Sequence, residues 1–147
     1  MNHDHFMTKA IEVAQQNLRA PFGTILVDRR TDEIVAEGCN QAKLNPTFHG
    51  EMVALNNFAS SHKTGWEQLC LYTTAEPCCM CQAAIIWAGI PEVVFGTSIS
   101  TLEILGWNQI NLSAQQVSEH AKFATCKITG GVSVNECDDL FRRAKQA

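Results

Sequence analysis

The stretch LCLYTTAEPCCMCQAAIIWA, residues 69–88, predicts a buried strand that passes directly into a helix. Residues 69–74 are rich in apolar, aromatic and β-branched side chains, which favours a strand. Pro77 then predicts a helix that runs to about Ala88, because proline is tolerated in a first helical turn. Cys78 and Cys81 lie at this helix start, with a spacing that puts both sulfurs on one side of the turn. The stretch therefore predicts an α/β fold with reactive side chains where the strand gives way to the helix.

The rest of the chain continues this alternation of strands and helices. Helical spacing of apolar residues predicts an amphipathic helix over residues 4–19, with Asp4 as its N-cap. The further elements we expect are strands at 24–28, 34–38, 92–95 and 126–129, and helices at 49–60, 113–120 and from 134 onward. No element is assigned to residues 98–112. An opening hairpin followed by alternating helices and strands predicts a mixed sheet with helices on both faces.

The length and composition predict a single folded domain over residues 1–147. Hydrophobic residues make up 46% of the chain and charged residues 18%, which fits an ordered globule. The sequence starts without the basic and apolar segments of a secretory signal, and no apolar run approaches the roughly 20 residues that span a bilayer. The seven cysteines are odd in number, which favours reduced thiols and metal ligation over disulfides. We therefore expect a cytoplasmic protein without a membrane segment.

Basic residues are scarce in the middle of the chain, and the formal net charge is −4. Between residues 31 and 121, Lys43 and Lys63 stand against nine acidic side chains. A groove built from this part of the chain would attract a polyanion poorly. We therefore do not expect nucleic acid as a partner.

Two segments at predicted helix starts carry metal-ligand chemistry, one with His49 and Glu51 and the other with Cys78 and Cys81. The partial positive charge of a helix N-terminus favours the thiolate, which is the form that binds zinc. His49, Cys78 and Cys81 are three protein ligands, and no second CxxC or HxxxH completes a closed structural site. A zinc ion with three protein ligands keeps a position for water, and Glu51 can accept that water's proton. The sequence predicts one catalytic Zn²⁺ per chain, with Glu51 as the catalytic acid and base.

The order H-x-E followed by P-C-x-x-C is the signature of zinc deaminases, and the chain resembles the cytidine deaminase-like superfamily over nearly its whole length. The nearest branch contains guanine deaminases, fungal-type cytosine deaminases and tRNA adenosine deaminases. The likeness is carried by Pro21-Phe22-Gly23, Glu37-Gly38-Cys39-Asn40, Leu71–Pro77 and Ile128–Val132. This resemblance implies a three-layer α/β/α fold with a five-stranded mixed sheet and a homodimer. It also implies hydrolysis of an exocyclic amine to a carbonyl, with release of ammonia.

Four residues are candidate substrate contacts. Asn40 matches the position where the family places a base-binding asparagine, although asparagine also favours simple turns. By analogy, the carbonyl of Glu76 or of a neighbour lies beside the water or the leaving amine. Phe48 and Trp107 could stack on an aromatic base. Trp87 ends a uniformly apolar segment, so we expect it against the sheet or a partner subunit.

Departures from the family pattern favour a small substrate. Gly50 occupies the middle of the histidine motif, where alanine is commonest and fungal cytosine deaminases have glycine. Residues 98–111 lack a stretch that is typical of tRNA deaminases. With the acidic middle of the chain, these features favour a free nucleobase or related small amino-heterocycle of the guanine or cytosine type. The alternatives are a tRNA-specific adenosine deaminase acting at the anticodon wobble position, or a non-catalytic zinc-stabilised binding module.

Overall fold

The computed structural model describes residues 1–62 and 64–146 and contains a five-stranded sheet in the order β2-β1-β3-β4-β5. Its strands are β1 (Gly23–Asp28), β2 (Glu33–Cys39), β3 (Leu69–Ala75), β4 (Glu92–Thr97) and β5 (Lys127–Thr129). β1 is antiparallel to both of its neighbours, whereas β3, β4 and β5 run parallel. The sheet is therefore mixed, as the sequence predicts.

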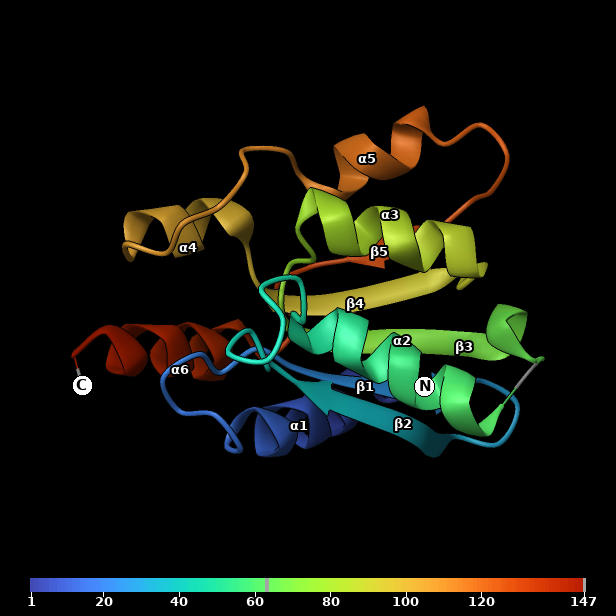
Figure 1. Cartoon of the computed structure of the whole chain (residues 1–147), viewed down its shortest axis with the longest axis horizontal. Coiled ribbons are helices and arrows are strands. Elements are labelled where there is room, and N and C mark those ends of the chain that lie inside the picture. Colours follow the sequence, from blue (N-terminus) through green and yellow to red (C-terminus); the bar gives the residue numbers. More distant parts are fainter. Residues whose placement is uncertain (63, 147) are drawn as a thin grey trace.

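Helices cover both faces of this sheet (Figure 1). They are α1 (His3–Ala14), α2 (Gly50–Ser61), α3 (Cys79–Ala88), α4 (Ile99–Ile104), α5 (Ala114–His120) and α6 (Val134–Gln146), with a 3₁₀ turn η1 at Trp66–Gln68. α1 and α6 pack on one face, and α2 and α3 pack on the other. The expected three-layer α/β/α fold is confirmed.

The central strand β3 is buried along all of its length. Successive strand side chains point to opposite faces, so each strand feeds two cores. Cys70 and Tyr72 join the core beneath α1, and Leu69 and Leu71 join the core beneath α2 and α3. Burial on both faces explains why residues 69–74 are a continuous apolar run and not an alternating one.

The first helix is shorter than the sequence predicts, and its predicted cap is wrong. α1 ends at Ala14, and the side chain of Asn2, not that of Asp4, accepts the capping hydrogen bond from the His5 amide. Asn17 lies in the turn after the helix, where its amide oxygen accepts from Ala20 N–H and its amide nitrogen donates to Asn40 O at 3.2 Å. An asparagine side chain that bonds the backbone in this way competes with helix continuation.

Residues 98–112, which received no prediction, begin with the short helix α4. Trp87, expected against the sheet or a partner subunit, is 76% exposed in this chain, so it does not pack on the sheet. Its ring centroid lies 4.7 Å from that of Phe123. None of the described helices is both long enough and apolar enough to cross a membrane.

Candidate metal centre and its cavity

Two helix starts meet beside the C-terminal end of β3. His49 is the N-cap residue of α2 and Cys78 is the N-cap residue of α3, and both have extended backbone angles. Cys81 lies in the first turn of α3 and is fully buried. Ligands commonly bind at the carboxyl ends of strands in open α/β sheets, and this site lies at such an end.

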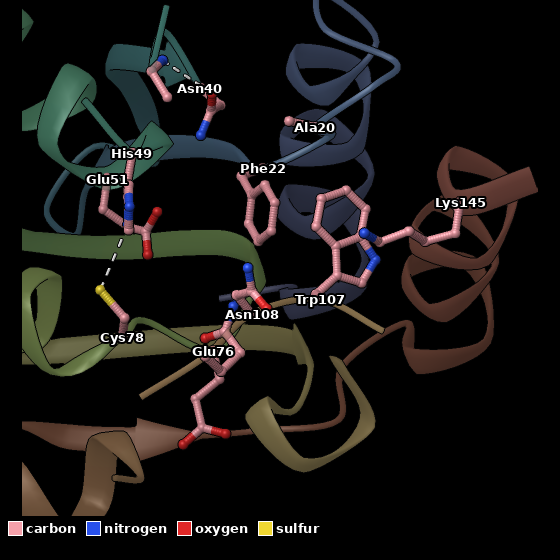
Figure 2. Close-up of a pocket in the computed structure, with 12 residues that line it drawn as sticks. Ala20, Phe22, Asn40, His49, Glu51, Glu76, Cys78, Trp107, Asn108 and Lys145 are labelled. Atoms are coloured by element: carbon pink, nitrogen blue, oxygen red, sulfur yellow. Dashed lines mark hydrogen bonds between the residues drawn. The ribbon is translucent and has the colours of Figure 1, made fainter. Parts of the chain in front are cut away.

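The three predicted metal ligands have the spacing that zinc requires. His49 Nδ1 lies 3.5 Å from Cys78 Sγ (Figure 2). It lies 3.6 Å from Cys81 Sγ. Donor atoms on a tetrahedral zinc ion, with Zn–S near 2.3 Å and Zn–N near 2.0–2.1 Å, stand about 3.6 Å apart. His49, Cys78 and Cys81 are also the one candidate metal-ligand cluster within residues 1–62 and 64–146. The donor set therefore fits a zinc ion bound by two sulfurs and one nitrogen.

The thiols of Cys78 and Cys81 have different pKa values. A hydrogen bond with Cys81, aided by His49, lowers the pKa of Cys78 to about 4. The same bond, together with burial, raises the pKa of Cys81. The pair thus presents one thiolate readily, and a bound cation would favour loss of the second proton.

Glu51 lies in the first turn of α2 and is 3% exposed. Its Oε1 atom has no hydrogen-bond partner among the described residues. Burial, followed by the nearby Cys78 charge, raises the pKa of Glu51 to about 7. A buried carboxyl oxygen without a partner needs one, because leaving such a group unsatisfied is unfavourable. It can therefore bind a water molecule or a substrate atom.

Gly50 allows the start of α2 to pack directly against the chain before β1. A β-carbon at this position would overlap the carbonyl oxygen of Phe22 and lie 3.3 Å from Gly38 O. The same Phe22 oxygen accepts the backbone N–H of Asn40 at 3.2 Å. The close approach explains why glycine, and not the commoner alanine, follows His49.

A cavity of about 290 Å³ opens beside the metal ligands (Figure 2). The figure shows His49, Glu51 and Cys78 on one side, Trp107 on the opposite side, and Phe22 between them. The lining residues comprise two aromatic rings, three amides, the metal-site groups and a few others: Ala20, Phe22, Asn40, Ala42, His49, Glu51, Glu76, Cys78, Trp107, Asn108, Gln109 and Lys145. The volume is near the lower end of the roughly 300–1,000 Å³ typical of ligand sites.

Three of the four predicted substrate contacts line this cavity: Asn40, Glu76 and Trp107. The Asn40 side-chain oxygen accepts from Ala42 N–H at 3.1 Å and so shapes a turn, while its amide nitrogen donates to none of the described residues. Phe48 does not line the cavity.

Six lining residues were not predicted as site residues: Ala20, Phe22, Ala42, Asn108, Gln109 and Lys145. Phe22 belongs to one of the segments that carry the family resemblance, but that resemblance assigns it no contact with substrate. The Lys145 ammonium lies 4.4 Å from the centre of the Trp107 ring, an arrangement typical of cation–π contacts. No local pattern in the sequence joins residues this far apart along the chain.

Comparison with known proteins places these features in context. Residues 1–97 match the family model of the cytidine and deoxycytidylate deaminase zinc-binding region. A Schizosaccharomyces pombe protein named "Probable cytosine deaminase" is 35% identical over 100 residues, which cover 66% of this chain and 61% of that protein. A Streptococcus pyogenes tRNA-specific adenosine deaminase is 36% identical over 101 residues, which cover 64% of this chain and 62% of that enzyme.

The fold matches a crystal structure of a guanine deaminase from Nitrosomonas europaea. The TM-score is 0.86 at 21% sequence identity, over 98% of this chain and 85% of the other. At this identity the match shows a shared fold. The sequence matches to the two relatives span about three fifths of the relatives' own lengths, 61% and 62%.

Proposed function

Because the chain belongs to the family defined by the cytidine and deoxycytidylate deaminase zinc-binding region, we propose that it is a zinc-dependent hydrolytic deaminase of a free nucleobase or related small heterocycle. The reaction replaces an exocyclic amine by a carbonyl, consumes one water and releases ammonia. One observation carries the proposal: Glu51, whose buried Oε1 has no hydrogen-bond partner among the described residues, lines a small cavity together with His49 and Cys78. A metal site that served only to stabilise the fold would not need such a group.

The residues of the site divide the chemical work. His49, Cys78 and Cys81 hold the zinc, which when bound supplies Lewis acidity that makes water a stronger acid. Glu51 accepts one proton of the attacking water and delivers it to a ring nitrogen, where it stays. Glu51 then accepts the second proton, from the hydroxyl now on the ring carbon, and delivers it to the departing amine, so that the carbonyl forms and ammonia leaves. Burial of Glu51 keeps bulk water from competing for this proton.

The cavity supports a planar, uncharged ring as substrate. Phe22 and Trp107 offer aromatic faces and edges, and stacking of a base on an aromatic side chain is worth about 1–3 kcal/mol. Asn40, Asn108 and Gln109 each carry both a donor and an acceptor, as the edge of a nucleobase does. The volume of about 290 Å³ suits one heterocycle without further nucleotides.

The runner-up is a tRNA-specific adenosine deaminase, since a relative with that name is about as similar as the cytosine deaminase. Lys145 is the one cationic lysine or arginine that lines the cavity within the described chain. Binding of RNA gains most of its free energy from contacts between cations and phosphates. The charge distribution therefore favours a free base of the guanine or cytosine type.

We also propose a homodimer in the cytoplasm. Trp87 and Phe123 form an exposed aromatic pair on the outer side of α3, and large exposed apolar groups often mark subunit contacts. Light scattering of the zinc-loaded protein should give twice the mass of one chain; the mass of a single chain would contradict the dimer.

A substrate panel tests the proposed activity. Ammonia release from the zinc-loaded protein is measured with guanine, cytosine, isocytosine, adenine and creatinine, and with an anticodon stem-loop in parallel. We expect turnover of guanine or cytosine. Turnover of the stem-loop alone would favour the tRNA-specific adenosine deaminase. If the zinc-loaded protein turned over none of these compounds, a non-catalytic zinc-stabilised binding module would be favoured.

The Glu51→Gln variant tests the role of the acid and base. We expect a loss of about 10²–10⁴-fold in turnover, the usual contribution of a positioned proton-transfer group, with zinc near one per chain. Glu92→Gln is a matched control, because Glu92 is also buried but lies at the opposite end of its strand, beside Arg29. Retained turnover in Glu51→Gln would defeat the mechanism, and loss of zinc would mean that Glu51 helps to hold the metal.

A further inference from the structure

Glu76, which the sequence suggested as a substrate contact, directs its carboxylate away from the cavity centre. Figure 2 shows its side chain running away from Glu51 and Phe22. Its Oε1 accepts the backbone N–H of Ile99 at 2.9 Å, and its Oε2 accepts the backbone N–H of Ala114 at 2.8 Å. Both carboxylate oxygens are thus used by the protein itself, from a side chain that is only 8% exposed.

The two amides that Glu76 binds have no acceptor within their own helices. Ile99 and Ala114 are the first residues of α4 and α5, where backbone N–H groups lack an intrahelical partner. The preceding serines, Ser98 and Ser113, each accept from a different amide, three residues further along the chain. Ile99 and Ala114 are buried, so water cannot replace the carboxylate without local opening.

The segment between these two amides forms one wall of the cavity. We call residues 99–114 the cavity loop; it contributes Trp107, Asn108 and Gln109 to the lining. Trp107 is held from outside by a hydrogen bond from its Nε1 to Phe141 O at 3.2 Å. Asn108 makes no side-chain hydrogen bond to the described residues, so the loop backbone sets its place. A single carboxylate therefore ties both ends of the wall to the end of β3.

We propose that Glu76 is a positioning residue that sets substrate affinity and selectivity by pinning both ends of the cavity loop. The kinetic part of this inference rests on the proposed deaminase function, whereas the pinning does not. Glu51 and the zinc ligands come from other elements, so loosening the loop affects binding of the ring more than proton transfer.

Glu76→Gln tests the inference in the zinc-loaded full chain, with Glu92→Gln as the matched control. Glutamine keeps the size of the side chain but offers one acceptor oxygen, so one of the two amides loses its partner. Amide hydrogen exchange should become about tenfold faster at Ile99 or Ala114, the ratio expected for loss of one buried hydrogen bond, and stay unchanged in β3 and α2. KM for guanine or cytosine, whichever turns over, should rise about tenfold with kcat within about threefold.

Ala114→Pro removes one of the same bonds from the donor side and covers the case in which Glu76→Gln does not fold. Proline suits the first position of a helix, and Ser113 before it has φ −73° and ψ 155°, which a following proline permits. Because proline has no amide hydrogen, exchange in this variant is followed at Gln116, whose N–H donates to Ser113 Oγ. We expect exchange at Gln116 to become faster and KM to rise.

Three results would overturn the inference. Unchanged exchange at both Ile99 and Ala114 in a folded Glu76→Gln protein would refute the pinning, as would unchanged exchange at Gln116 in Ala114→Pro if Glu76→Gln does not fold. Equally faster exchange throughout the chain would mean that Glu76 stabilises the fold without acting on the loop. Local loosening with unchanged KM and substrate preference would refute the effect on binding. If the parent protein deaminates none of the bases, the proposed function fails, and hydrogen exchange alone then decides the pinning.

Discussion

Replacement of Gly50 by alanine tests whether the start of α2 packs directly on the chain before β1. A β-carbon would overlap Phe22 O, and would lie 3.1 Å from Phe22 C and 3.3 Å from Gly38 O. All three are backbone atoms, which cannot rotate aside as the end of a flexible side chain can. The first turn of α2 or the chain around Phe22 must therefore shift.

The expected loss follows from two opposing effects. Alanine in place of glycine favours a helix by up to about 1 kcal/mol. Overpacking of a close-packed site costs about 1–3 kcal/mol. We expect the free energy of unfolding to fall by about 1–2 kcal/mol, which for a chain of this size lowers the melting temperature by about 2–8 °C.

Urea unfolding of the zinc-loaded proteins, with metal analysis, measures this effect. A shift of Phe22 would also disturb His49 and Asn40, which flank the contact, so zinc affinity should fall and KM should rise. Ala59→Gly is a matched control in the same helix: Ala59 is exposed, and glycine there should reduce stability through helix propensity without loss of zinc. A Gly50→Ala protein as stable as the parent, or more stable, would refute the reasoning.

Three further predictions concern single contacts. Thr74 Oγ1 donates to Pro21 O at 2.9 Å and accepts from Gly23 N–H at 3.1 Å. Thr74→Val should therefore lower the free energy of unfolding, measured by urea unfolding, by about 1–3 kcal/mol, and an unchanged value would mean that these bonds do not stabilise the protein. The side-chain hydrogen bond from Arg30 lowers the pKa of Asp28 from 3.8 to about 2, so its stabilisation is present above pH 3.8 and is lost as the pH falls through 2. In Arg30→Gln the pKa of Asp28, followed by NMR, should return toward 3.8; an unmoved midpoint would exclude Arg30 as the cause. Trp107→Phe loses the hydrogen bond to a backbone oxygen of α6, so KM should rise about fivefold with little change in kcat. An unaltered KM would mean that this hydrogen bond does not position the ring for substrate binding.

Local patterns in the sequence were sufficient for most of the fold. β3 and α3 follow from an apolar run, a proline and a helical period, all within residues 69–88. The predicted end of α1 was wrong because the Asn17 side chain bonds to Asn40, 23 residues away, and no local pattern in the sequence indicates that contact. α4 has six residues, too few for a clear period, and its first amide depends on a carboxylate from another part of the chain.

The metal site was predictable for a related reason, and its cavity was not. The spacing of Cys78 and Cys81 and the nearby placement of Glu51 and His49 are local features of two helix starts. Only tertiary structure brings Phe22 and Lys145 to the same cavity from opposite ends of the chain. The proposed catalytic residues thus have a sequence signature, whereas the residues that would recognise a substrate do not.

The attachment of the cavity loop separates chemistry from recognition along the chain. The proposed metal ligands and Glu51 lie within residues 49–81, whereas the cavity loop comprises residues 99–114 and is bonded to the end of β3 by one carboxylate. Insertions or exchanges between Ile99 and Ala114 can therefore reshape the cavity wall while leaving the metal ligands in place. During divergence, a protein built in this way can acquire a new substrate by replacing the cavity loop alone. A designer can transplant such a loop in the same way, provided that both amides that bind the carboxylate are kept.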